Sequence, residues 1–225
     1  MAYLWCGIDV SRGAILTTNC IPFDEDYNFK EDKFDGTWYE VRRLNDPQDV
    51  LHEDCVVTNY QIGDEGSFEI QQSYQIGDES EPIYRAGRAE PKVFHNGRVS
   101  MFLQRFNTTA SADPDTTIDI VATDYTNYAI IYSCTSINTT YHDESAWVLS
   151  RQPALAKNVV ELVNVFLETR FKREDHKWRA IKQTADFCKP SRVEKLNSHL
   201  GGSQPLGATG LLPSIVLLLL ARLFH

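Results

Sequence analysis

Eight short strand-like segments follow one another through the centre of this 225-residue chain. Each is rich in β-branched and aromatic residues, and the Gly, Pro, Asn and Asp residues that turns require lie between them. The predicted strands are residues 37–44, 55–62, 67–76, 83–90, 98–106, 116–123, 128–136 and 145–151. Because short turns join consecutive strands, the pattern favours an all-β fold, an eight-stranded up-and-down antiparallel β-barrel, over a sandwich.

The hydrophobic period changes after the last of these strands. In residues 156–170 the apolar side chains recur at helical spacing with polar residues opposite, which predicts one C-terminal α-helix packed outside the barrel. Residues 177–187 are consistent with one more short edge strand. A barrel of about eight strands has an interior that side chains fill or that holds one small ligand, so the fold itself suggests binding.

The composition excludes some classes of partner. The formal net charge is −9, whereas nucleic-acid-binding proteins usually present a basic face, so we expect no nucleic-acid partner. The six histidines are scattered without the spacing of a catalytic set or of a metal site. We therefore expect neither a metal nor a cofactor.

The cysteines indicate an oxidising compartment. Five of them lie far apart in the chain: Cys6, Cys20, Cys55, Cys134 and Cys188. No two form a Cys-x-x-Cys pair, and such wide spacing is typical of disulfides. The four within the predicted barrel domain, residues 20–190, allow three pairings. Asn107 and Asn138 each begin an Asn-x-Thr glycosylation sequence, which agrees with a secretory route.

The first 19 residues are predicted to lie outside the folded domain. Apolar runs in this segment are interrupted by Asp9 and Arg12, so it has the character of an incomplete leader peptide or of a disordered N-terminus. Cys6 is then the odd cysteine, and the barrel domain begins at Cys20.

Residues 191–225 are predicted to be a linker and a hydrophobic tail. Residues 211–220 form an apolar run that is too short to cross a bilayer as a helix. Small residues lie upstream, so the segment has the pattern of a GPI-anchor signal, with three attachment candidates: Gly201, Gly202 and Ser203. A short membrane-inserted tail is the alternative, and a buried core helix is disfavoured because the run has no polar face.

Three short motifs predict how one end of the barrel closes. In Gly36-x-Trp38 the glycine permits a close approach of the backbone, and the indole is a large apolar body whose N–H needs a partner once buried. Asp124 lies in the turn between the sixth and seventh strands, where its carboxylate can accept backbone hydrogen bonds. Arg151 has the inward parity of the last strand and must be paired or stacked, for which an indole face is suitable.

These motifs resemble the conserved regions of the lipocalin family, and the resemblance extends from about residue 20 to residue 190. It implies that Trp38 plugs the closed end of the barrel beside Gly36 and that Arg151 packs across the indole. It also implies that the turn of Asp124 and Tyr125 closes the same end. The fold expected from the resemblance is the same eight-stranded barrel.

The resemblance selects one pairing of the cysteines, Cys20–Cys134 with Cys55–Cys188. Each bond would close a loop of more than 100 residues, worth about 4–5 kcal/mol in the chain-entropy model. Some lipocalins act as isomerases through a free cysteine in the cavity. With these four cysteines paired and Cys6 outside the barrel, that nucleophile has no counterpart, so we predict no enzymatic activity.

The family binds fatty acids, retinoids, steroids or bilins, which implies a small hydrophobic ligand as the partner of this chain. Five residues are candidates for ligand contact, the first by resemblance and the others by their strand parity: Tyr60, Trp147, Met101, Leu103 and Ile131. The last three are the weaker candidates, since a β-bulge reverses the parity of a strand.

Asp119 stands within the sixth predicted strand. If its side chain faces inward, the interior gains an acidic group near Arg85 or Arg88. If a bulge turns it outward, it is a surface charge, and we favour this second orientation.

Two functions agree with these observations. The first is binding or transport of a small hydrophobic ligand outside the cell or at its surface. The second is a glycolipid-anchored cell-surface protein that meets a protein partner through its loops, which the tail and the glycosylation sequences favour. Both place the chain in the secretory pathway, either secreted or on the extracellular face of the plasma membrane.

Overall fold

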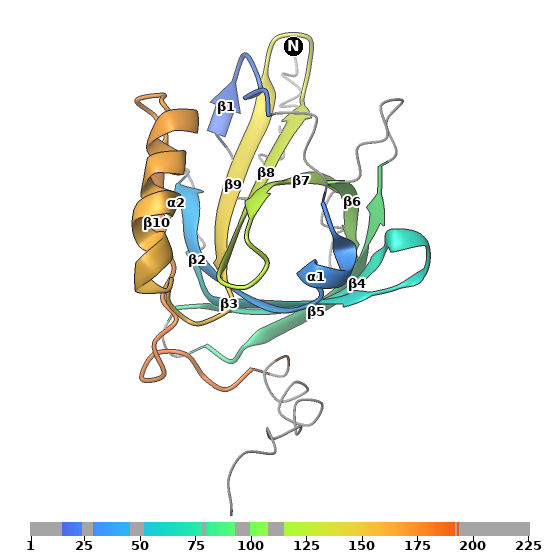
Figure 1. The fold of residues 1–225 in the computed structure, drawn as a ribbon, viewed down its shortest axis with the longest axis vertical. Helices are drawn as coiled ribbons and strands as arrows, with labels where there is room; N and C mark the ends of the chain where they lie inside the picture. The colour runs from blue at the N-terminus through green and yellow to red at the C-terminus, as the bar shows by residue number, and fades with distance from the viewer. Residues whose placement is uncertain are drawn as a thin grey trace, which may run out of the picture.

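The strands of the protein form one ten-stranded antiparallel sheet that closes into a barrel (Figure 1). The computed structural model describes residues 15–23, 29–45, 52–77, 80–92, 100–107, 115–191 and 193. Strands β2 to β9 pair in sequence order, and β9 pairs again with β2, which closes the ring. The predicted eight-stranded up-and-down barrel is therefore confirmed.

The elements lie close to the predicted segments. The strands are β1 (Ile15–Thr17), β2 (Gly36–Asn45), β3 (Glu53–Ile62), β4 (Phe68–Ile76), β5 (Ile83–Pro91), β6 (Met101–Phe106), β7 (Thr116–Thr123), β8 (Tyr128–Ser136), β9 (His142–Ser150) and β10 (Lys177–Ala180). The helices are α1 (Glu31–Phe34), the 3-10 turn η1 (Asp64–Gly66) and α2 (Lys157–Arg170).

Strand β1 corrects the expected N-terminal boundary. Ile15 pairs with Glu144 of β9 and Thr17 pairs with His142, so the folded part begins before Cys20. The reason lies in β9, which pairs with β2 only through its second half. The first half would otherwise present an unpaired edge, and β1 covers it.

The edge strand expected at residues 177–187 is shorter in the structure. Strand β10 pairs with residues 42–45 of β2 and ends at Ala180, and the chain turns near Thr184, whose carbonyl accepts the N–H groups of Phe187 and Cys188. Strand β2 pairs with β3 only over residues 36–39. Strand β10 therefore pairs with the end of β2 on the same side as β3, beyond the residues that pair with β3.

Helix α2 lies outside the barrel wall, as its period predicted (Figure 1). Val163 and Leu167 are buried against apolar side chains of the wall, among them Val41 and Val148. We call this side of the sheet the outer face. The opposite side is the inner face, and its apolar residues, Trp38 among them, form a separate cluster inside the ring.

Both disulfides implied by the resemblance are present. Cys20–Cys134 ties the segment after β1 to β8, and Cys55–Cys188 ties β3 to the segment after β10. They join residues 114 and 133 positions apart in the sequence.

Several predicted features lie outside the described residues. These are Cys6, the GPI attachment candidates Gly201, Gly202 and Ser203, and the apolar run 211–220. Among the residues that are described, no helix has both the length and the apolar character needed to cross a membrane.

Candidate functional site

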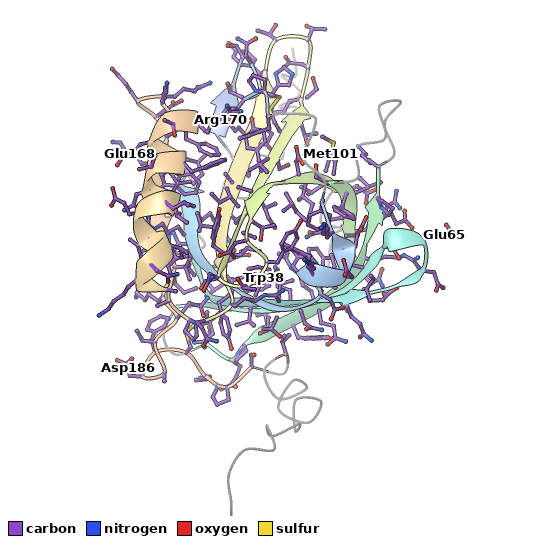
Figure 2. All side chains as sticks on the ribbon, viewed as in Figure 1. Trp38, Glu65, Met101, Glu168, Arg170 and Asp186 are labelled. Carbon is purple, nitrogen blue, oxygen red and sulfur yellow. A yellow bond between two sulfur atoms is a disulfide. The ribbon has the colours of Figure 1, made fainter. Side chains whose placement is uncertain are left out.

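One end of the barrel is filled by packed aromatic rings around Trp38, which is fully buried. The short helix α1 brings Phe34 onto the indole with ring centres 5.0 Å apart, and the indole N–H donates to the Phe34 carbonyl at 2.9 Å. The predicted partner of the buried N–H is thus a backbone oxygen. Figure 2 shows Trp38 within the ring, near α1.

Arg151 lies across the indole, as its parity predicted. The guanidinium carbon is 3.8 Å from the centre of the Trp38 ring. Its N–H groups donate to the backbone carbonyls of Tyr125 at 2.9 Å, of Thr37 at 3.1 Å and of Lys33 at 3.0 Å. Burial lowers the pKa of Arg151 to about 10, so the guanidinium stays protonated at neutral pH.

Gly36 has the role that the motif implied. Its φ of +103° lies in a region that favours glycine, and a Cβ there would stand 3.2 Å from Nη1 of Arg151. The first position of β2 is therefore occupied by the residue type that lets the arginine approach.

The turn after β7 closes the same end. Oδ1 of Asp124 accepts the backbone N–H groups of Thr126, Asn127 and Tyr128, and Oδ2 accepts from the Asn127 side chain at 2.7 Å. Burial alone would raise the pKa of Asp124, but these hydrogen bonds outweigh it and lower the pKa. The Tyr125 hydroxyl accepts the N–H of Lys30, which ties the turn to the segment before α1.

Tyr60 points to the inner face but lies in the closed end. Its register partner is Gly36, and its ring contacts Phe34 at 5.1 Å and Phe68 at 5.8 Å. The residue is only 5% exposed, and burial raises the pKa of its hydroxyl. Tyr60 is therefore part of the packed floor.

Trp147 and Ile131 lie on the inner face, in agreement with their parity. They are register partners across β8 and β9, and Ile131 belongs to the inner cluster. Trp147 packs against that cluster and is only partly buried. Phe106, at the end of β6, also packs against the inner cluster and is also only partly buried.

The inward orientation expected for Met101 and Leu103 is wrong. Phe102 pairs with Ile118, and both belong to the inner cluster, so the alternate residues Met101 and Leu103 occupy the outer face. The residues that sequence reasoning missed are Phe102 and Phe106. Their even spacing on one strand was the available signal.

Asp119 faces outward, as favoured, yet it is not a surface charge. Its register partners are Met101 and Tyr132 on the outer face, and it is 6% exposed. The Ser100 hydroxyl donates to its carboxylate at 2.9 Å. Simple alternation with Ile118 turns Asp119 outward, since the bulge in β7 comes after it, between residues 120 and 122.

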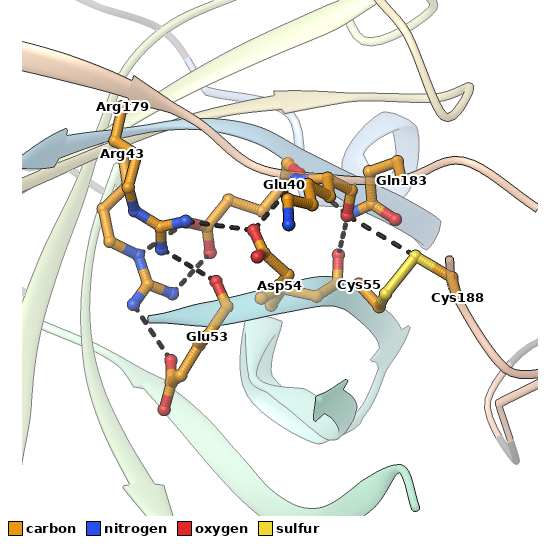
Figure 3. A network of polar contacts seen from close by, with 10 residues as sticks. Glu40, Arg43, Glu53, Asp54, Cys55, Arg179, Gln183 and Cys188 are labelled. Atoms are coloured by element: carbon orange, nitrogen blue, oxygen red, sulfur yellow. Dashed lines mark hydrogen bonds and ion pairs between the residues drawn. A yellow bond between two sulfur atoms is a disulfide. The ribbon is translucent and has the colours of Figure 1, made fainter. Parts of the chain in front are cut away.

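A buried charged network lies beside Trp147 and was not anticipated (Figure 3). Arg43 is the register partner of Trp147. Its guanidinium donates to both oxygens of Glu40, at 2.6 and 3.0 Å, and to Glu53 at 2.9 Å. Burial raises the pKa of Glu40, and Arg43 opposes that rise. Arg179 of β10 extends the network to Asp54 at 3.0 Å.

A bulge in β2 creates this network. The register with β9 shifts between Glu40 and Arg42, so that Val41 and Arg42 both face outward. Arg42 then bonds Asn164 of α2, while Arg43 turns to the inner face. One inserted residue thus decides which of two adjacent arginines enters the barrel.

The glycosylation candidates are both exposed. Asn107 follows β6, and Asn138 lies in the turn between β8 and β9. In the described part of the chain, no three His, Cys, Asp or Glu side chains come together as metal ligands.

Comparison with known proteins places this geometry in a family. The model of the lipocalin / cytosolic fatty-acid binding protein family matches residues 35–183. The chain is similar to apolipoprotein D of Bos taurus, with 26% identity over 133 residues, 59% of this chain and 66% of that protein. It is 29% identical to the crustacyanin-A1 subunit of Homarus gammarus over 126 residues, 56% of this chain and 64% of that subunit. The matched segment thus spans slightly less than two thirds of each relative.

A solved structure agrees with the fold. Insecticyanin from the tobacco hornworm Manduca sexta superposes with a TM-score of 0.65, covering 80% of this chain and 94% of that one at 21% sequence identity. At this identity the likeness concerns the barrel alone.

Proposed function

Because this chain belongs to the lipocalin / cytosolic fatty-acid binding protein family, whose members bind small hydrophobic ligands, we propose that it carries one such ligand inside its barrel. One observation supports this most directly. The inner face is closed at one end by the packed floor of Trp38, whereas Trp147 and Phe106 on the same face are only partly buried. Partly buried aromatic side chains on a concave apolar wall are the surface that a hydrophobic ligand would cover.

The inner residues divide into a floor and a wall. Tyr60 belongs to the floor on which the ligand rests, and Trp147 and Ile131 belong to the wall that the ligand contacts. Met101 and Leu103 have no part in the site, since they occupy the outer face. Burial of apolar ligand surface, at about 25 cal/mol per Å², supplies the affinity. Fatty acids, retinoids, steroids and bilins all have the required apolar body.

The test uses protein purified from its own source. Native mass spectrometry and absorption spectra should reveal a co-purified fatty acid, retinoid, steroid or bilin. In parallel, cis-parinaric acid is titrated into the delipidated full chain while tryptophan fluorescence is followed. Quenching should be strong in the wild type and weaker in Trp147→Phe, with Trp178→Phe, on the outer side, as the matched control. Absence of both a co-purified compound and any quenching would exclude the carrier function.

A second candidate is a cell-surface interaction protein of the Lazarillo type, held by a glycolipid anchor. The apolar run 211–220 behind Gly201, Gly202 and Ser203 supports it, as does the exposed turn that carries Asn138 between Ile137 and Tyr141. The two disulfides are consistent with the secretory pathway. Phosphatidylinositol-specific phospholipase should release the protein from cells, and retention after treatment would contradict the anchor.

Glycosylation is tested separately. Asn107→Gln and Asn138→Gln should each increase electrophoretic mobility if the corresponding side chain carries a glycan. Unchanged mobility in both variants would contradict the assignment.

A further inference from the structure

Two serines stand opposite each other on the inner face of β8 and β9. Ser133 of β8 and Ser145 of β9 are register partners, and Ile131 and Trp147 form the neighbouring inward pair. Side chains two positions apart on a strand point to the same face, so both serines point into the barrel as Ile131 does. A polar row therefore lies next to an apolar row on one wall of the barrel.

The two rows have a fixed order along the barrel. Strand β9 ends at Ser150, and Arg151 after it lies on the indole at the closed end. Trp147 is therefore nearer to the floor, and Ser145 lies about 7 Å further along the strand toward the open end. The register of β8 with β9 runs without a bulge, so no shift reverses these faces.

The fold itself does not use the two hydroxyls. Ser133 is 5% exposed, and Ser145 is partly buried. Within the described part of the chain, neither hydroxyl is hydrogen-bonded to another group. Buried hydroxyls normally have a partner, because burial without one costs free energy. A pair of such groups beside an aromatic wall therefore indicates a place for a polar atom that comes from outside the fold.

The spacing of the pair suits one oxygen atom. The Cβ atoms of directly opposed residues in antiparallel strands lie about 4.5–5.5 Å apart, and an O–H···O bond spans about 2.7–2.8 Å. One ligand oxygen between Ser133 and Ser145 can thus reach both hydroxyls. A serine hydroxyl both donates and accepts, so it binds a ligand hydroxyl or carbonyl without any charge.

The neighbouring charges favour a neutral group at this place. Arg43 of β2 is the register partner of Trp147. Its guanidinium is already paired with the carboxylates of Glu40 and Glu53. Two negative groups therefore surround one positive group, and this network offers no net attraction to an anion.

We propose that Ser133 and Ser145 bind a neutral oxygen of the ligand, either a hydroxyl or a carbonyl. This inference rests on the proposed carrier function. The ligand is then an apolar compound with an oxygen near one end, and its apolar body contacts Ile131 and Trp147 and points to the floor. The two serines are the residues that separate oxygenated ligands from hydrocarbons of the same shape.

The test compares two neutral probes of nearly equal shape, 1-hydroxypyrene and 1-methylpyrene. The delipidated full chain is titrated with each at neutral pH, and quenching of tryptophan fluorescence gives both dissociation constants. The wild type should bind 1-hydroxypyrene roughly three- to tenfold more tightly, as one net hydrogen bond provides. Ser133→Ala and Ser145→Ala should each reduce this preference, and the double variant should abolish it without changing the affinity for 1-methylpyrene.

Ser136→Ala is the matched control. Ser136 also lies on β8, but it is exposed on the outer face, and its hydroxyl donates to the Asn138 carbonyl oxygen. This variant should keep the preference of the wild type.

The unpaired hydroxyl also predicts an effect without any ligand. Ser133→Ala removes no hydrogen bond of the fold, so its urea midpoint should be no lower than that of Ser136→Ala. A lower midpoint would show that the fold itself uses the Ser133 hydroxyl and would refute its role in the ligand site.

A parallel titration with cis-parinaric acid separates the inference from the carrier function. If no probe binds the wild type, the carrier function fails and the inference fails with it. If cis-parinaric acid binds but the wild type does not prefer 1-hydroxypyrene, or if the double variant keeps the preference, the chain is a carrier but the role of the serines is refuted. Continued binding of 1-methylpyrene by the variants shows that they are folded.

Discussion

Arg151 covers the indole of Trp38 at 3.8 Å, and the two residues join the end of β9 to the start of β2. This is the place where the ring of strands closes. The guanidinium also bonds carbonyls from α1, from β2 and from the turn after β7. A single side chain thus connects the end of β9 with two regions that are distant from each other in the sequence, the α1–β2 segment and the turn after β7.

Replacing Arg151 by Met should destabilise the whole barrel. The variant leaves at least three carbonyls without their donor and uncovers the indole, so the free energy of unfolding should fall by about 2–4 kcal/mol. Urea denaturation followed by circular dichroism measures the change. Arg88→Met, an exposed site, should shift stability by no more than about 0.5 kcal/mol, and equal midpoints for the two variants would contradict the role of Arg151.

Asp124 should make the barrel sensitive to acid. Its pKa is lowered in the folded state, so the stabilisation is fully present above the ordinary carboxylate pKa and is lost as pH falls through the folded value. Asp124→Asn should therefore be less stable than the wild type at neutral pH, and the difference should shrink below about pH 4. Thermal melting at several pH values measures this, and a difference independent of pH would refute it.

Because alternate residues of β6 face the inside and the outside of the barrel, two substitutions in this strand should affect ligand binding differently. Phe106→Ala removes an apolar ring from the inner face, so affinity for cis-parinaric acid should fall roughly tenfold. Leu103→Ala changes only the outer face and should leave the dissociation constant unchanged. Equal losses of affinity in the two variants would show that the strand does not present these faces to the ligand.

Arg43→Met should be far more damaging than Arg42→Met. The first leaves Glu40 and Glu53 buried without their partner, at a cost of about 3–5 kcal/mol, whereas the second removes one bond to Asn164 on the outside, worth about 1 kcal/mol. Chemical denaturation compares the two variants.

The Arg43 variant should also respond to pH. Burial raises the pKa of Glu40, and a carboxyl group with a raised folded pKa contributes stability that is lost as pH rises. Arg43→Met should therefore be less destabilised in mild acid than at neutral pH. Adding Glu40→Gln should restore part of the stability and weaken the pH dependence. A cost that is equal at all pH values would contradict this account.

Much of the fold could be predicted because it depends on neighbours within a few residues. Alternating apolar residues bounded by turn residues predict strands, and the helical period of residues 156–170 predicts α2. The inward orientation of Arg151 could also be predicted from the alternation of side chains along its own strand. The pairing of the cysteines could not be predicted from local pattern alone, since four cysteines allow three pairings. The resemblance to a family selected the pairing that the structure has.

The inner and outer faces of some strands could not be predicted in the same way. Met101, Phe102 and Leu103 are consecutive apolar residues, so either phase of β6 places apolar side chains on the inner face. The pairing of Phe102 with Ile118 selects one of them. In β2 the bulge after Glu40 places Arg43, not Arg42, inside. A strand has a period of two, which relates its residues to one another but does not state which set faces the core.

By itself, then, the sequence determined the eight strands of the ring and their order, the outer helix and the motif of Gly36 and Trp38. These properties reside in local propensity and periodicity. Only the tertiary structure decided that Phe102 and Arg43 face inward and that residues 15–17 pair with β9. Each of these depends on a partner strand or segment far away in the chain, whose register no local pattern contains.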